Sequence, residues 1–149
     1  MKLPESLFAV INPCIIWLLR SPAHGLLSSG VMLITFTGRN SGRTFTTPVR
    51  YIRDGGVIRS FTARNNQWWR NMREPVEVTL RIAGKDGRYL MQAVTDDPTR
   101  IRAKLLRLLA LYPQDAPYYD IELGPDKLPK PGHLDRAVEA TAMVEARAV

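Results

Sequence analysis

Three strand-like runs follow one another between residues 31 and 62, and only turn sequences separate them. Val31–Thr37 and Thr44–Ile52 are rich in β-branched and aromatic residues, and Val57–Thr62 forms the third run. Gly38–Gly42 separates the first two runs, and the Asp54-Gly55 pair before the third is a strong hairpin signal. Consecutive hairpins of this kind predict an antiparallel sheet.

The strand pattern continues in the second half of the chain. Val76–Ile82 alternates apolar and polar residues, as a half-buried strand does. The Lys85-Asp86-Gly87 sequence predicts the next turn, and Arg88–Thr95 predicts a fifth strand. Residues from Leu134 onward predict a short helix followed by a sixth strand. We therefore expect an α+β fold of about six antiparallel strands, with the sheet curled toward a barrel.

Helices are predicted before, between and after these strands. One begins at Pro4, runs to about Arg20 and is kinked at Pro13. A short helix carrying Trp68, Trp69 and Met72 is expected to have Asn65 or Asn66 as its cap. Another is expected from Pro98 to about Leu111, capped by Asp97, and Tyr112–Pro131 is read as a loop.

The length of 149 residues suits one compact domain with a sizeable core. Within that domain, residues 1–30 are expected to form a helical N-terminal segment and residues 31–149 the barrel. The two histidines and the single cysteine stand far apart in sequence, so no metal site is predicted.

The formal net charge of +7 favours anionic partners such as phosphates and acidic cofactors. The arginines are spread through strands and turns rather than gathered in one run, which suits a basic groove. No recognised nucleic-acid motif is present, so we expect no specific nucleic-acid partner.

The Gly38–Gly42 loop has the features of an anion site. Arg39 and Arg43 surround Asn40 and Ser41, and tight backbone with fixed cations suits a phosphate. A plain hairpin turn is the competing interpretation, because Asn-Ser-Gly sequences form turns without ligands.

Trp68 and Trp69 follow the loop by about 25 residues and offer flat apolar area. Core packing is the competing interpretation, and at least one of the two is expected to be purely structural. Together with the loop, the pair predicts a site for a phosphorylated, ring-bearing ligand.

The order of these motifs resembles the deazaflavin (F420)-dependent nitroreductase and quinone reductase family. That family is a branch of the flavin-reductase-like split β-barrels, which resemble the pyridoxamine-phosphate oxidase fold. The ordered match covers roughly residues 33–117. The Thr-Gly-basic-x-Ser-Gly loop followed by the Trp-Trp-Arg-Asn box is fairly specific in combination. The matching segments are Leu33–Arg43, Thr47–Tyr51, Asp54–Gly56, Trp68–Met72, Pro75–Thr79 and Leu111–Pro113.

The resemblance implies a split β-barrel and a bound coenzyme F420, whose reduced form delivers hydride to a quinone, a nitroaromatic or an activated alkene. It assigns the phosphate and acidic tail of the coenzyme to the loop residues Arg39, Asn40, Ser41, Gly42 and Arg43. It assigns the wall beside the ring to Phe61, Thr62, Ala63 and Arg64, with Trp68 and Trp69 as support. Tyr112 and Tyr118 would line the substrate side and are the catalytic candidates.

Family members tend to carry a lysine where Asn40 stands and an arginine where Phe45 stands. FMN is therefore an alternative to F420, and a non-catalytic cofactor- or lipid-binding barrel is an alternative to an enzyme. The sequence has no Ser/His/Asp set and no paired-carboxylate signature, which agrees with chemistry carried by a coenzyme ring.

The expected partners are a small-molecule electron acceptor and, by analogy with other split barrels, a second copy of the chain. A cytoplasmic location is expected because no cleavage site follows the apolar run at residues 7–19. Trp17 and its apolar neighbours also make the N-terminal helix a candidate for contact with a membrane surface.

Overall fold

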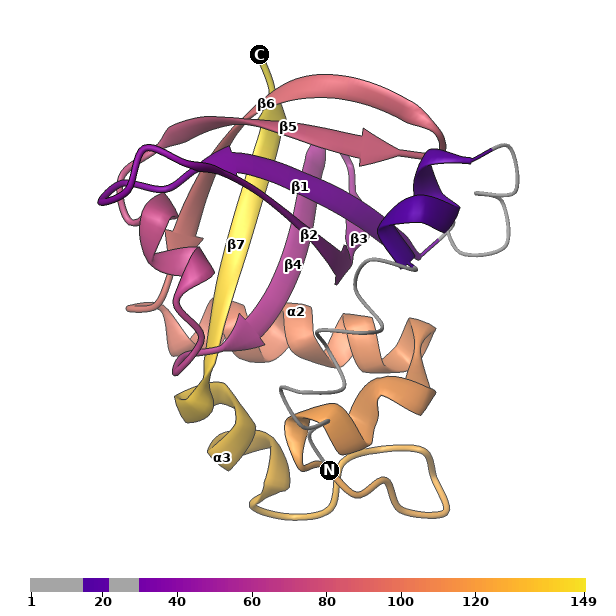
Figure 1. Ribbon diagram of the computed structural model, residues 1–149. Helices are drawn as coiled ribbons and strands as arrows, with labels where there is room; N and C mark the ends of the chain where they lie inside the picture. Colours follow the sequence, from indigo (N-terminus) through magenta and orange to yellow (C-terminus); the bar gives the residue numbers. More distant parts are fainter. Residues whose placement is uncertain (1–14, 22–29) are drawn as a thin grey trace.

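Antiparallel strands form one curled sheet in the computed structural model, which describes residues 15–21 and 30–149 (Figure 1). The strands are β1 (Val31–Thr37), β2 (Thr44–Arg50), β3 (Ile52–Asp54), β4 (Val57–Ala63), β5 (Val76–Ile82), β6 (Lys85–Val94) and β7 (Thr141–Ala148). The helical elements are η2 (Trp68–Met72), α2 (Pro98–Leu111), η3 (Pro113–Tyr119) and α3 (His133–Ala140), together with residues 15–20.

The strand order is β2-β1-β5-β6-β7-β4-β3, with every neighbouring pair antiparallel. β2 and β3 are thus the two edges of the sheet, yet a single residue, Tyr51, joins them in sequence. A connection that short requires the two edges to approach each other, so the sheet must curl. The hydroxyl of Ser60 in β4 donates to the Arg50 carbonyl of β2 at 2.7 Å, which secures the closure.

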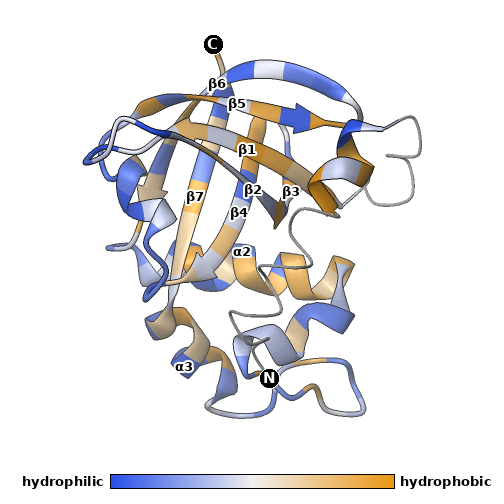
Figure 2. Ribbon diagram, viewed as in Figure 1, coloured by the Kyte–Doolittle hydropathy of each residue, from blue (hydrophilic) through white to orange (hydrophobic). Residues whose placement is uncertain are grey.

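Two hydrophobic cores lie on the two faces of this sheet. The first core gathers residues that face the inside of the barrel, such as Ile34, Ile58 and Met72. The second core lies between the sheet and the helices α2, η3 and α3, and it includes Phe61 and Leu105. Hydrophobic residues accordingly run along β1 and α2 in Figure 2.

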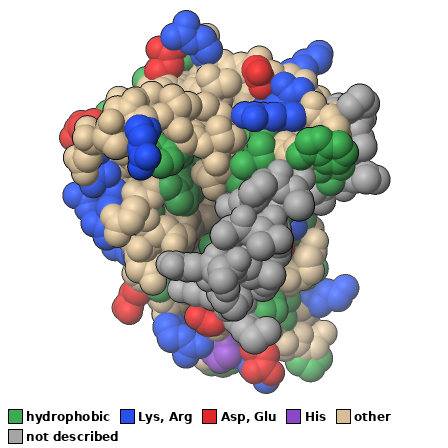
Figure 3. Space-filling view, in the orientation of Figure 1, with side chains coloured by type: hydrophobic (Ala, Val, Ile, Leu, Met, Phe, Trp, Pro, Cys, Tyr) green, Lys and Arg blue, Asp and Glu red, His purple; other side chains and the backbone are tan. Residues whose placement is uncertain are grey.

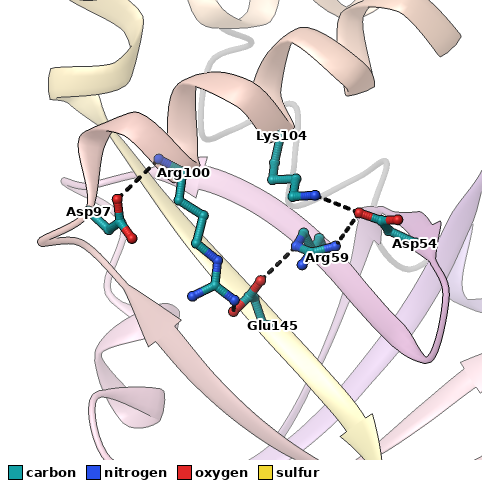
Figure 4. A network of polar contacts seen from close by, with 6 residues as sticks. All are labelled: Asp54, Arg59, Asp97, Arg100, Lys104 and Glu145. Atoms are coloured by element: carbon teal, nitrogen blue, oxygen red, sulfur yellow. Dashed lines mark hydrogen bonds and ion pairs between the residues drawn. The ribbon is translucent and has the colours of Figure 1, made fainter.

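A charge network ties α2 to the sheet (Figure 4). The buried Arg59 of β4 donates from Nε to Glu145 Oε2 at 2.6 Å and from Nη1 to Asp54 Oδ2 at 2.9 Å. From α2, Lys104 Nζ reaches Asp54 Oδ2 at 2.6 Å and Arg100 bonds Glu145. The hydrogen bond from Lys104 is the main reason that the pKa of Asp54 is lowered. Each buried charge therefore has a partner, which a low-dielectric site requires.

The α+β split-barrel prediction is confirmed, with two local differences. The expected strand Thr44–Ile52 is interrupted at Tyr51, so the sheet has seven strands rather than about six. The turn predicted at Lys85-Asp86-Gly87 is wrong. The turn lies at Ala83-Gly84, where both residues have positive φ, and Lys85 already pairs with Ile82.

The helix predictions are partly confirmed. Asp97 caps α2, with its Oδ1 accepting from the Arg100 N–H at 3.1 Å. The cap predicted for η2 is wrong, because Gln67 precedes that helix without a side-chain cap and Asn66 bonds Thr62 instead. The segment predicted as a loop contains η3.

At the N-terminal side, residues 15–20 are helical and Trp17 is 70% exposed. The Leu19 carbonyl accepts from Arg81 Nε of β5 at 3.2 Å, so this helix is tied to the sheet. The predicted helix start at Pro4 and the kink at Pro13 lie outside the described residues. None of the described helices is long and apolar enough to span a bilayer. Membrane contact through Trp17 stays a prediction.

We expect Leu105→Ala to destabilise the protein by about 2–5 kcal/mol, because Leu105 is fully buried in the second core and its truncation leaves a cavity. The matched control is Leu111→Ala on the same helix, where the side chain is 54% exposed and the change should stay within about 0.5 kcal/mol. Urea unfolding measures both variants. Equal effects would contradict the placement of α2 against the sheet.

Candidate functional site

The β1–β2 hairpin loop is closed by its own backbone. Gly38 N–H donates to the Arg43 carbonyl at 2.8 Å, and Gly42 N–H donates to the Gly38 carbonyl at 2.9 Å. The Arg43 N–H also donates to the Ser41 hydroxyl at 3.2 Å. A Cβ at Gly38 would lie 2.7 Å from the Phe45 ring, so only glycine fits where the ring covers the backbone. Gly42 has a φ of 67°, which glycine adopts without strain.

The cations of this loop are exposed, and among the described residues neither Arg39 nor Arg43 has a carboxylate partner. Within the same part of the chain, the N–H groups of Asn40 and Ser41 have no acceptor. Unpaired guanidinium groups beside free backbone donors match the oxygens of a phosphate. The loop thus fits the anionic end of a phosphorylated coenzyme.

Asn71 connects this loop to η2 although the two are far apart in sequence. Its Oδ1 accepts from the Arg39 N–H at 2.8 Å, and its Nδ2 donates to the Trp68 carbonyl at 2.8 Å. The loop and the Trp-Trp-Arg-Asn segment are therefore held together at one end of the barrel (Figure 1).

A row of aromatic rings extends from the loop. Arg43 lies over the Phe45 ring at 5.8 Å from its centroid, and Phe45 stacks on Phe36 with a centroid distance of 5.7 Å. Phe36 in turn lies 6.4 Å from Trp68. Figure 3 shows this face hollowed beneath the hairpin, with hydrophobic side chains beside the hollow. Phe36 is buried in the first core, whereas Phe45 is 41% exposed and Trp68 is partly buried. The apolar area of these two outer rings beside a cationic loop suits a ring joined to a phosphate.

A hydrogen-bonded cluster stands at the far end of this row. The Thr62 hydroxyl accepts from Trp68 Nε1 at 3.2 Å and from Asn66 Nδ2 at 2.8 Å. The Tyr118 side chain of η3 lies beside Asn66 and Thr62, and both groups act to lower its pKa. Burial raises the pKa of Tyr118 by more than these neighbours lower it, so its hydroxyl stays protonated at neutral pH.

Tyr112 lies at the opposite end of η3 from Tyr118. Its ring packs under the Arg50 guanidinium, with 4.1 Å between Cζ and the ring centroid. Arg50 also donates to both carboxylate oxygens of Asp115, at 2.8 and 3.1 Å. The two tyrosines predicted on the substrate side therefore belong to one segment of the chain but face different neighbours.

The side chains of the other residues predicted for the ring wall point away from the Thr62 cluster. β4 alternates, so Thr62 lies on one face while Phe61 and Ala63 lie on the other, where Phe61 belongs to the second core. Arg64 donates to the carbonyls of Thr141 and Thr95, at 3.0 and 2.8 Å.

Trp69 is buried, and its Nε1 donates to the Arg64 carbonyl at 3.1 Å. The structure thus brings Thr62, Trp68 and Tyr118 together and gives Phe61, Arg64 and Trp69 supporting positions.

Three residues of this arrangement, Phe36, Phe45 and Asn66, were not predicted as site residues from the sequence. Phe36 and Phe45 pair directly across the hairpin, and counting outward from the loop would have found them. The sequence did not mark Asn66 as a site residue, because an asparagine just before a helix is usually its N-cap. Among the described residues no cluster of His, Cys, Asp and Glu could hold a metal ion.

The chain is similar to a family of known proteins over most of its length. The model of the family described as F420H(2)-dependent quinone reductase matches residues 22–121. No curated protein shows significant similarity to the chain.

Three solved structures are similar in fold. One, described as a domain-swapped dimer, has a TM-score of 0.53 and 14% identity, and the match covers 97% of this chain and 100% of that one. A protein of unknown function from Agrobacterium tumefaciens str. C58 has a TM-score of 0.52 and 16% identity, with 88% and 56% covered. An F420 reductase has a TM-score of 0.46 and 17% identity, with 87% and 94% covered.

The first two structures support the split-barrel fold. The family match spans 100 of the 149 residues and includes the hairpin loop, the Trp-Trp-Arg-Asn segment and η3. The chain therefore belongs to the F420H2-dependent quinone reductase family and is an oxidoreductase that uses coenzyme F420.

Proposed function

We propose that this protein transfers hydride from reduced F420 to a quinone, with nitroaromatics and activated alkenes as further acceptors of the same electronic kind. One observation carries the proposal. A series of contacts leads from Arg43, which has no carboxylate partner among the described residues, through the rings of Phe45, Phe36 and Trp68 to the Thr62 hydroxyl, and Tyr118 lies beside that hydroxyl. A coenzyme with an anionic end and a redox ring needs such a sequence of surfaces.

The hairpin loop would hold the anionic end of the coenzyme. Arg39 and Arg43 offer guanidinium donors, and Asn40 and Ser41 offer N–H groups that the described residues leave without acceptors. Arg43 stands beside Phe45 where family members tend to carry an arginine, so it can supply the positive charge that Phe45 does not. Gly42 leaves the loop open, with no atom within 4 Å of a Cβ built there.

The ring would lie along the aromatic row, with Thr62 at its edge. Trp68 is held by its bond to Thr62, so its indole plane is fixed before a ligand arrives. When bound, reduced F420 supplies the hydride. The protein supplies orientation and a surface that excludes water. Phe61, Ala63, Arg64 and Trp69 would act behind this surface, by packing and by backbone hydrogen bonds.

Tyr118 would stabilise the electron acceptor while it is reduced. Quinones and nitroaromatics gain negative charge on oxygen when they accept hydride, and a protonated phenol is a suitable hydrogen-bond donor to that oxygen. Thr62 and Asn66 are the polar neighbours of the Tyr118 hydroxyl. Tyr112 would border the same acceptor from the other end of η3.

A homodimer is part of the proposal, and one of the structures similar in fold is itself described as a domain-swapped dimer. In the described part of the chain, β2 pairs only with β1, so one edge of this strand carries no strand partner. Such an edge is a usual place for chains to pair.

Arg43→Ala should weaken F420 binding about tenfold, because it removes one charge-assisted contact with the anionic end. Arg39→Ala should do the same. Quenching of tryptophan fluorescence by added F420 measures the dissociation constants.

The matched control is Arg88→Ala, an exposed arginine of β6 whose side chain pairs with Glu77. Its dissociation constant should equal that of the wild type. Equal binding by all four proteins, or tighter binding of FMN than of F420, would contradict the assignment of the loop.

Tyr118→Phe should lower kcat for a quinone such as menadione by roughly a hundred- to a thousandfold, the range expected when one donor to a developing oxyanion is removed. The dissociation constant for F420 should not change. Tyr89→Phe in β6 serves as the control for loss of a phenol hydroxyl. A variant with full kcat would exclude Tyr118 as the donor, and wild-type binding of F420 without any turnover would indicate a carrier.

The quinone reaction should show no loss of kcat between about pH 7 and pH 9. Burial raises the pKa of Tyr118 above its ordinary value of 10.0, so the donor remains protonated throughout this range. Stopped-flow measurement of coenzyme oxidation at saturating acceptor gives the profile. A fall in kcat centred below pH 9 would show that another group titrates in the rate-determining step.

A further inference from the structure

η3 packs on the outside of the sheet, and polar side chains of the sheet approach it at two places. Near its end, Tyr118 lies beside Thr62 of β4 and Asn66, which follows that strand. Near its start, Asp115 receives two hydrogen bonds from Arg50 at the end of β2. Between these points the buried Ala116 packs into the second core. η3, which contains Tyr118 and directly follows Tyr112, therefore contacts the sheet near both of its ends.

The Arg50–Asp115 pair has a geometry that an ordinary surface ion pair lacks. Both nitrogens of the guanidinium fork, Nε and Nη2, donate to the two carboxylate oxygens. The two side chains are only 27% and 20% exposed, so water screens the pair weakly. Hydrogen bonding to Asp115 raises the pKa of Arg50, in agreement with a well-formed contact.

The rest of the Arg50 side chain is also enclosed. Its guanidinium stacks on the Tyr112 ring, and a Cβ built on Gly30 would lie 2.4 Å from Arg50 Nη1. Glycine at position 30 is thus required for the guanidinium to lie there. Arg50 consequently contacts both the residue that precedes η3 and a residue within it.

We infer that Arg50 is a positioning residue for the acceptor site: through Asp115 and Tyr112 it sets where η3 holds Tyr118 opposite the coenzyme ring. This inference rests on the proposed function. Arg50 itself would touch neither coenzyme nor acceptor. Its effect passes along η3, from Asp115 to Tyr118.

A conservative variant of Arg50 tests whether the shape of its guanidinium group matters or only its positive charge. Arg50→Lys keeps the positive charge but cannot donate two parallel hydrogen bonds or stack as a planar group. We expect kcat for menadione to fall about tenfold. The F420 dissociation constant and the melting temperature should stay near the wild-type values, a combination that a merely structural role would not produce.

A double-mutant cycle tests whether Arg50 acts through Asp115. Arg50→Ala and Asp115→Ala should each lower kcat, and the double variant should lose no more than the worse single variant. The control is Arg102→Ala, which breaks the exposed pair between Arg102 of α2 and Asp135 of α3 and should leave kcat unchanged. Additive losses, or a fall in melting temperature without a change in kcat, would overturn the inference.

Hydrogen exchange gives a readout that does not depend on turnover. The N–H groups of Asp120 and Ile121 bond the carbonyls of Pro117 and Ala116 at 3.0 Å, so their exchange reports the order of η3. Both should exchange faster in Arg50→Lys than in wild type. If the wild type reduces no acceptor, the proposed function fails while the exchange rates still decide the inference, and unchanged rates would overturn it.

Discussion

The connection through Tyr51 is the constraint on which the rest of the structure depends. It joins β2 and β3, the two edges of the sheet, and so prevents the strands from lying as an open sheet. Closure creates an interior that the first core fills and an exterior on which α2, η3 and α3 pack. The end of β2 is thereby brought to the helices, and Arg50 meets Asp115 there.

In the closed sheet the arginines fall into two groups, which differ in exposure and in whether they have a carboxylate partner. Where sheet and helices meet, Arg50, Arg59 and Arg100 each have a carboxylate partner, because a cation taken from water requires one. At the hairpin tip, Arg39 and Arg43 are exposed and unpaired within the described residues. The net charge of +7 therefore does not describe one uniform basic surface. The two arginines at the hairpin tip are the cations that we propose for binding an anion.

Local sequence sufficed for elements whose signals lie within a few residues. The strands from Val31 to Ala63, the Asp97 cap and the C-terminal strand were predictable from alternation, turn residues and capping chemistry. The errors arose where two local patterns compete. Lys85-Asp86-Gly87 is a good turn sequence, yet the tighter Ala83-Gly84 turn lets Lys85 pair with Ile82. Asn66 is a suitable N-cap residue, yet its side-chain amide donates a hydrogen bond to the Thr62 hydroxyl instead.

What the sequence alone determined is the antiparallel strand series, the chemistry of the glycine-bounded cationic loop and the family to which the chain belongs, because each is written in neighbouring residues. Only the tertiary structure decided which face of β4 each residue occupies and that Asn71 joins the loop to Trp68. It also decided that Arg50 pairs with Asp115 and is not part of the proposed anion site. These contacts join residues up to 65 positions apart, and pairings at that range follow from sheet closure, which no local pattern encodes.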